Sequence, residues 1–360
     1  MLRIHQIKCG LDEHLDQKMV ARKLGCPADA VRSYAIERES LDARRDSCMF
    51  SYTVLADVRQ PERYLHLKDV QTADERPYEI PVAAHMPAHQ PVIAGFGPAG
   101  MFAGLLLAEA GLKPLILERG AMAKERQSDV QNYFSGGPLN PESNVQYGEG
   151  GAGTFSDGKL TTRIKDDRVR KVIAELIEAG APEKIAYEAH PHLGTDRLVD
   201  IVTAVRHKII RLGGEVRFHE RLEGIRMQNG RLSAVLSSNE DIPADCLILC
   251  IGHSARDTYE KLYAQQVFLE QKEFAVGARA EHPQILIDRN QYGRFCGHPR
   301  LEPAEYHLTH TAANGRGVYT FCMCPGGIVI PSASEPETIV VNGMSYSARN
   351  GKSANSAILV

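Results

Sequence analysis

The sequence predicts an α/β protein, in which a parallel-sheet domain with a β-meander follows a small βαββ domain and precedes an α+β region. Three observations lead to this prediction. Gly95, Gly97 and Gly100 lie between a short apolar strand and a helix-like segment. Apolar residues alternate in strand-like runs on both sides of one helical run in residues 1–58. Asn229 and Gly230 join two alternating segments, as in a tight hairpin.

The composition is ordinary for a folded protein of 360 residues, with 43% hydrophobic and 24% charged residues. The net charge of −3 gives no overall field that would attract nucleic acid or an anionic membrane, so we expect neither as a partner. The N-terminus lacks the apolar core of a signal peptide, and no segment approaches about eighteen uninterrupted apolar residues. Together with eight irregularly spaced cysteines, these features predict a cytoplasmic protein.

The first 58 residues form the predicted βαββ domain. Its acidic and basic residues balance, which favours packing or docking of a protein partner over RNA binding. Residues 59–90 are punctuated by prolines and show little periodicity, so we expect a linker there. The next domain is predicted over residues 91–273, with a loop-rich segment at 132–190, and a substrate domain over 274–360.

The segment "PVIAG" ends a buried strand at the predicted phosphate-binding turn. Gly95 permits the turn, Gly97 lets a pyrophosphate approach the backbone, and Gly100 lets helix and strand pack closely. Pro98 and Ala99, which lie between Gly97 and Gly100 in the sequence, are also assigned to the cofactor site. The anion would lie at the positive end of the helix that runs to about Ala110. This pattern, with a strand before and a helix after it, predicts dinucleotide binding.

An acidic residue follows the second strand of this unit. Glu118 lies at the end of "KPLILERG", where it can accept hydrogen bonds from both ribose hydroxyls and would repel a 2′-phosphate, which disfavours NADP. Arg119 is adjacent and is also assigned to the cofactor site.

A second glycine-dense segment spans residues 136–158 and favours a longer cofactor that is contacted twice, although an ordinary surface loop is the alternative. Its candidate contacts are Gly150, Gly151, Ser156, Asp157 and Lys159. Asp157 is as well suited to capping the turn before Gly158.

Further along, the sequence predicts a helix over about 195–212, the strand "EVRFH", a hairpin beginning near Leu222, and a buried strand ending at Gly252. This order matches the plan of a flavin domain, with Leu222 and Gly252 beside the cofactor. No second G-x-G-x-x-G follows the strand that ends at Gly252, so a separate NAD(P)H domain is not expected, and NAD(P)H would visit only transiently.

Several long motifs carry a family resemblance: "GFGPAGMFAGLLLAEAG", "GEGGAGTFSDGKLTTR", "GHSARDT", "FCMCPGG" and "NGMSYSARNGKSANSA". With them the chain resembles the uncharacterised FAD-dependent dehydrogenases, also described as NAD(FAD)-utilising dehydrogenases, which are relatives of the glutathione-reductase-like flavoproteins. The resemblance implies a glutathione-reductase-like FAD-binding Rossmann domain with a β-meander, an inserted α+β substrate domain and a small N-terminal βαββ domain. It also implies that such proteins continue past residue 360, so we expect a C-terminally truncated chain with an incomplete substrate domain.

The predicted function is an FAD-dependent oxidoreductase that acts on a small organic substrate by hydride transfer through flavin N5. Lys159 and Arg163 are the basic residues expected nearest the flavin, where a cation stabilises the reduced anion. Cys322 and Cys324 form a C-x-C pair for which a redox dithiol, two metal ligands and simple packing on one strand face all remain open; no metal site is predicted. The alternatives are a non-catalytic flavin- or nucleotide-binding module that docks a partner, and an inactive fragment.

Overall fold

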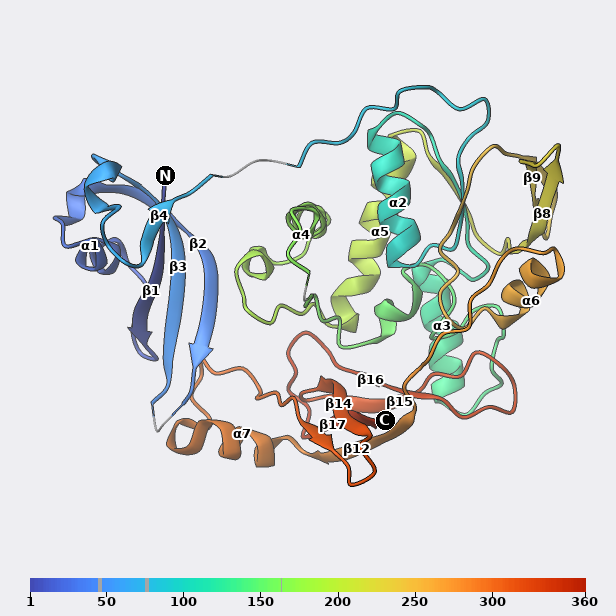
Figure 1. The fold of residues 1–360 in the computed structure, drawn as a ribbon. Helices are drawn as coiled ribbons and strands as arrows, with labels where there is room; N and C mark the ends of the chain where they lie inside the picture. Colours follow the sequence, from blue (N-terminus) through green and yellow to red (C-terminus); the bar gives the residue numbers. More distant parts are fainter. Residues whose placement is uncertain (45–46, 75–77, 163) are drawn as a thin grey trace.

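The computed structural model describes residues 1–44, 47–74, 78–162 and 164–360. It has three parts, visible in Figure 1: an N-terminal antiparallel sheet, a central α/β part with a parallel sheet, and a C-terminal antiparallel sheet. Arg163, a candidate flavin neighbour, lies outside the described residues.

The N-terminal sheet has the strand order β2-β3-β1-β4 and is antiparallel at the pairs β1–β3, β1–β4 and β2–β3. The Asp16 side chain caps the helix α1 by accepting from the Met19 N–H, and Gly25 ends it in the left-handed conformation. The alternating side chains bury a core that includes Ile4, Val20 and Val54. The elements are β1 (Leu2–Gly10), α1 (Gln17–Leu24), η1 (Ala28–Ala30), β2 (Val31–Asp42), β3 (Met49–Val58), η2 (Pro61–Tyr64) and β4 (Val70–Thr72).

The expected linker over 59–90 is wrong at its start. The short strand β4 pairs with β1 and places the buried Val70 opposite Ile4, so the chain belongs to the N-terminal sheet as far as Thr72. Three residues give too short an alternation to be recognised among prolines and charges. Between Thr72 and β5, the described residues form no helix or strand.

The central sheet consists of four parallel strands in the order β11-β5-β6-β7. The helices α2 and α5 lie side by side on one face (Figure 1), where Leu105 and Ile209 pack against Ile93 and Ile116 of the strands. Gly104 allows this close approach, because a Cβ atom there would lie 2.5 Å from Cδ1 of Ile116. The elements are β5 (Val92–Ala94), α2 (Pro98–Glu109), β6 (Leu115–Leu117), α3 (Ala123–Phe134), η3 (Gly151–Phe155), α4 (Arg168–Glu178), η4 (Glu183–Ala186), α5 (Thr195–Arg211), β7 (Glu215–Arg217) and β11 (Leu247–Leu249).

The predicted meander covers the other face of this sheet. The strands β8 (Leu222–Gln228), β9 (Arg231–Ser237) and β10 (Asp241–Pro243) pair antiparallel, and Val235 and Ile242 pack on Val92 and Leu117. The turn residues Asn229 and Gly230 both have positive φ, 53° and 75°, as a type I′ hairpin requires.

The last strand of the central sheet differs from the prediction of a buried strand that ends at Gly252. β11 ends at Leu249, and the Leu249 side chain is 45% exposed. Among the described residues β11 pairs only with β5, so one of its sides has no neighbouring strand. The helix α6 (Arg256–Ala264) follows.

The C-terminal part contains a four-stranded sheet in the order β12-β17-β14-β13 and the two-stranded pair β15–β16. Ile330 and Met344 of that pair pack on Val145 and Phe155, which anchors this part to the central one. The elements are β12 (Gly277–Pro283), α7 (Gln284–Tyr292), η5 (Gly293–Phe295), β13 (Thr309–Thr311), β14 (Gly317–Cys324), β15 (Ile328–Pro331), β16 (Val341–Met344) and β17 (Ser353–Leu359).

A search of the described residues for helices with the length and apolarity needed to cross a bilayer finds none.

Candidate functional site

A cavity of about 660 Å³ lies at the carboxyl ends of β5, β6 and β11. Its walls come from the start of α2, from residues 146–148 and 151–153 of the second glycine-rich segment, and from the turn 249–255 after β11. The chain runs from β5 to β6 and β7 on one side and returns to β11 on the other, so the cavity lies where the strand order reverses. Ligands of open α/β sheets bind at this place.

The three glycines of the first turn have different surroundings. Gly95 has φ +100°, and a Cβ atom there would lie 2.3 Å from the Cys250 carbonyl oxygen. A Cβ atom at Gly100 would lie 1.8 Å from the Gly95 carbonyl oxygen, so both residues are required by the fold itself. A Cβ atom at Gly97 would contact only Gly151 among the described residues, at 3.6 Å. Gly97 therefore faces space that the protein leaves open.

The positive end of α2 points toward this space. Gly97 is the N-cap residue of α2, Pro98 is its first residue, and no side chain of the described residues caps the helix. Gly151 packs directly on this turn, since a Cβ atom there would lie 2.9 Å from Cα of Gly97. The two glycine-rich segments thus meet with only backbone between them, which creates a cradle for an anionic group.

Arg126 of α3 fixes the second glycine-rich segment. Its guanidinium is fully buried and donates to the carbonyl oxygens of Asn144 (2.8 Å), Val145 (2.9 Å), Glu149 (2.7 Å) and Gly151 (2.8 Å). Burial lowers the pKa of Arg126 to about 10, so it stays charged at neutral pH. This role could not be predicted from the sequence, because one arginine in a polar helix is typical of an exposed side chain.

Glu149 is the second anchor of the segment. Its buried carboxylate accepts from the Ala123 N–H (2.8 Å) and from Nε of Arg206 on α5 (2.8 Å). The Gly150 N–H donates to the Phe96 carbonyl oxygen (2.9 Å), which ties this segment to the first turn. The backbone of the cradle is therefore held from three sides.

Glu118 lines the cavity, but its buried carboxylate is engaged with the backbone. Oε1 accepts from the N–H groups of Gly120 (2.9 Å) and Gly148 (3.0 Å), and Oε2 accepts from the Phe96 N–H (2.8 Å). A carboxylate offers about four acceptor positions, so one remains on Oε2. Glu118 therefore has one free acceptor position, whereas the prediction that it accepts from both ribose hydroxyls requires two.

Arg119 forms part of the cavity wall and is held rigidly. It pairs with Glu142 (2.9 Å) and Asp257 (3.0 Å), and its guanidinium lies 4.2 Å from the centre of the Tyr147 ring. The Tyr147 hydroxyl donates to the Ser254 carbonyl oxygen (2.6 Å), which joins the wall to the turn after β11. Tyr147 and Asp257 were not among the predicted site residues.

The predicted cofactor residues divide into three groups. Gly100 and Gly150 do not line the cavity but pack against the segments that form its wall. Ser156, Asp157 and Lys159 do not line it either. The lining includes the others: Gly95, Gly97, Pro98, Ala99, Glu118, Arg119, Gly151, Leu222 and Gly252.

Asp157 and Lys159 instead join the glycine-rich segment to the C-terminal part. Asp157 is buried and pairs with the Arg349 guanidinium, and Lys159 Nζ lies 3.1 Å from its carboxylate. Lys159 also donates to the Met323 carbonyl oxygen (2.6 Å) and pairs with Glu305 (3.1 Å). Although burial favours the neutral acid, Arg349 and Lys159 outweigh it and lower the pKa of Asp157. Ser156 closes its own turn by donating to the Gly153 carbonyl oxygen (2.7 Å).

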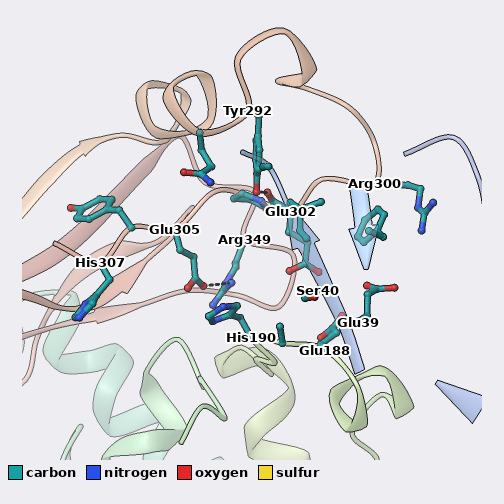
Figure 2. A pocket seen from close by; sticks show the side chains of 17 residues that line it. Glu39, Ser40, Glu188, His190, Tyr292, Arg300, Glu302, Glu305, His307 and Arg349 are labelled. Atoms are coloured by element: carbon teal, nitrogen blue, oxygen red, sulfur yellow. Dashed lines mark hydrogen bonds and ion pairs between the residues drawn. The ribbon is translucent and has the colours of Figure 1, made fainter. Parts of the chain in front are cut away.

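A second cavity, of about 420 Å³, lies between the N-terminal sheet, residues 188–190 and the C-terminal part (Figure 2). Its carboxylates are mostly paired: Glu305 with Arg349 (2.9 Å), and Glu188 (2.6 Å) and Glu302 (3.0 Å) with Lys184. This pairing leaves little uncompensated charge for a ligand.

Comparison with solved structures finds distant likenesses. The THI4 protein of Thermovibrio ammonificans is 18% identical, with a TM-score of 0.32 over 49% of this chain and 61% of that one. A 3-ketosteroid-Δ4-(5α)-dehydrogenase from Rhodococcus jostii is 14% identical, with a TM-score of 0.30 over 45% of each chain. An FAD-dependent pyridine nucleotide-disulphide oxidoreductase from Desulfovibrio vulgaris is 16% identical, with a TM-score of 0.20 over 47% of this chain and 26% of that one.

Family models match both ends of the chain. Residues 273–360 match "FAD-dependent protein, C-terminal domain-like", and residues 1–57 match a domain of unknown function (DUF8436). A protein of Clostridium beijerinckii, described as uncharacterized, is 46% identical over 367 residues, which cover 100% of this chain and 69% of that protein. The chain therefore belongs to the same family as this clostridial protein.

Proposed function

We propose that the 660 Å³ cavity binds FAD and that the protein is an FAD-dependent oxidoreductase of the NAD(FAD)-utilising dehydrogenase type, acting on a small organic substrate. The match of residues 273–360 to an FAD-dependent protein domain supports this cofactor. We further propose that residues 91–273 form the FAD-binding unit and that residues 274–360 contribute to the substrate side.

The meeting of Gly97 and Gly151 is the observation that carries the proposal. The cavity has the size of small-molecule and cofactor sites, roughly 300–1000 Å³. At its floor, an uncapped helix start faces a glycine backbone with no Cβ atom on either side. A pyrophosphate needs this combination, because its oxygens accept from backbone N–H groups and any side chain would hold it away.

The remaining wall residues have distinct roles in this proposal. Glu118 would accept one ribose hydroxyl at its remaining acceptor position, and its negative charge would exclude a 2′-phosphate. Arg119 and Tyr147 form a rigid charged and aromatic side of the cavity. When bound, flavin supplies hydride transfer at N5. Lys159 lies in the ion-pair cluster with Asp157, so we assign it to positioning of the C-terminal part and not to the cavity.

The test is a flavin spectrum of the purified chain, followed by anaerobic addition of NADH, NADPH or candidate organic substrates. The proposal predicts bound FAD that is released on denaturation, and bleaching of its absorbance by at least one donor. Bound FAD that no donor reduces would favour the flavin-binding module without catalysis. A chain that neither carries FAD nor takes it up would contradict the cofactor assignment.

A further inference from the structure

The strand β14 is irregular at its two cysteines. Its pairing with β17 shifts between Phe321 and Cys324, and Cys322 has φ +48°, a left-handed conformation that costs a non-glycine residue about 1–2 kcal/mol. Simple alternation predicted two cysteines on one face of a regular strand. The irregularity instead turns the backbone between them, and strained residues of this kind often lie at functional sites.

The two thiols contact each other. The Cys324 thiol lies within hydrogen-bonding distance of the Cys322 sulfur and 3.4 Å from the Cys322 carbonyl oxygen. That carbonyl also accepts from Nη1 (3.2 Å) and Nη2 (2.9 Å) of Arg279 on β12. Both cysteines are free thiols in this structure. The arrangement thus places two reduced sulfurs side by side next to a guanidinium.

The charges around the pair favour a thiolate at Cys322. The hydrogen bond from Cys324, assisted by Arg279 and Lys159 and opposed by burial and Asp157, lowers the pKa of Cys322 to about 6. The hydrogen bond to Cys322 and burial raise the pKa of Cys324 above its usual range. A low-pKa cysteine beside a second thiol is the arrangement in which one sulfur attacks and the other resolves.

Cys324 is held in place by its neighbours. It is fully buried, and Gly343 of β16 makes room for it, because a Cβ atom at Gly343 would lie 2.5 Å from Sγ of Cys324. The same Cβ atom would meet Oδ1 of Asn355 (2.5 Å) and Nη1 of Arg279 (2.7 Å). The buried Asn355 side chain accepts from Arg279, while its Nδ2 has no hydrogen-bond partner within the part of the chain that the structure describes.

Cys322, in contrast, opens onto a cavity of about 1160 Å³. Lys159, His310 and Tyr319 also line this cavity. It shares the residues Glu305, His307 and His190 with the cavity between the N-terminal and C-terminal parts, where Figure 2 shows them. A small molecule entering from this side reaches Cys322 first, and Cys324 lies behind it.

We propose that Cys322 and Cys324 are a redox-active dithiol that reduces small disulfides entering this cavity. The Cys322 thiolate attacks one sulfur of R–S–S–R, which breaks that bond and releases R–S⁻, and the released thiolate takes a proton from water. Cys324 then gives its proton to solvent, and its sulfur attacks Sγ of Cys322 and releases the second R–S⁻. The cysteine sulfurs lose two electrons, the external disulfide gains two, and a Cys322–Cys324 disulfide remains. One turnover needs no flavin, so this proposal is independent of the FAD site.

The experiment uses the whole reduced chain, freed of reductant, and glutathione disulfide as the probe. We expect loss of two hydrogen atoms from the protein mass, two equivalents of glutathione released, and a peptide-mapped Cys322–Cys324 disulfide. Cys324→Ser should stop at a stable mixed disulfide on Cys322. Cys246→Ser, which removes an exposed thiol, should still form the internal disulfide.

The pH dependence of the reaction with glutathione disulfide separates the redox role from a packing role, because packing alone would give no such dependence. The initial rate should fall by half near pH 6 and stay level above about pH 7, whereas an ordinary thiol of pKa about 8.5 keeps gaining rate with pH. The proposal would be overturned if the wild-type chain formed mixed disulfides and no internal disulfide. It would also be overturned if the adduct of Cys324→Ser mapped to cysteines other than Cys322. Alkylation mapping of the wild-type chain below pH 7 tests the proposal even if the variants misfold. Faster labelling of Cys322 than of Cys246 is expected, and equal labelling of the two would contradict the proposal.

Discussion

Replacing Arg126 tests how the second glycine-rich segment is held. Arg126→Met keeps the length of the side chain but removes donors to four carbonyl oxygens at 2.7–2.9 Å. The Glu149 carbonyl oxygen keeps the Thr154 hydroxyl as a donor (3.2 Å) and the bond to Gly151 is only part-buried, so the buried oxygens of Asn144 and Val145 carry the cost. A buried acceptor left without a donor costs about 1–3 kcal/mol, which puts the loss of unfolding free energy at about 2–6 kcal/mol. Removing the charge brings no offsetting gain, because it also takes the cation away from the buried carboxylates of Glu118 and Glu149.

The assay is urea unfolding followed by circular dichroism, with Arg231→Met at the exposed first position of β9 as the matched control. A change at that exposed position should stay within about 0.5 kcal/mol. We also expect Arg126→Met to weaken FAD binding, since Gly151 loses its anchor. A loss of less than about 1 kcal/mol with unchanged FAD affinity would refute the role assigned to Arg126.

The remaining predictions concern packing and buried charge. Gly100→Ala should destabilise the fold by about 3 kcal/mol in the same urea assay, because the new Cβ atom would lie 1.8 Å from a backbone oxygen that cannot move aside; a neutral result would contradict the turn geometry. Asp157→Asn should cost about 3 kcal/mol at pH 7, since it leaves the buried Arg349 with Glu305 alone. The pKa of Asp157 is lowered below 3.8 in the folded state, so its stabilisation is present above about pH 4 and is lost as the pH falls further. Stability curves of wild type and Asp157→Asn should therefore converge in acid, and curves that stay parallel would contradict the ion pair.

Local patterns in the sequence predicted much of the central fold. The glycine spacing located the turn before α2, and Asn229 with Gly230 located the hairpin of the meander, because both patterns depend on backbone geometry within a few residues. The exposure of Leu249 could not be predicted in this way. An apolar strand has the same sequence pattern at the centre of a sheet and at its edge. Only the order of the strands in the sheet distinguishes the two positions.

Contacts between distant segments account for the rest of the site. Asp157 precedes a glycine and looked like a turn residue or a cofactor contact, but its partner Arg349 lies 192 positions away. Arg126 acts on carbonyl oxygens that come 18–25 residues later, in a segment without regular periodicity. At Cys322 the alternation rule was wrong because the strand is irregular there, and nothing in "CMC" signals a bulge.

FAD affinity of a Gly97→Ala variant is the most direct test of the central claim. Among the residues that the structure describes, a Cβ atom at Gly97 makes only an ordinary van der Waals contact with Gly151, and a Cβ atom at the control position Gly317 has no neighbour within 4 Å. Both alanine variants should therefore unfold like the wild type. Titration of FAD into flavin-free protein should show binding to wild type and Gly317→Ala, and affinity at least about tenfold lower, or about 1.4 kcal/mol, for Gly97→Ala. Equal affinity of the three proteins would contradict a pyrophosphate at the start of α2.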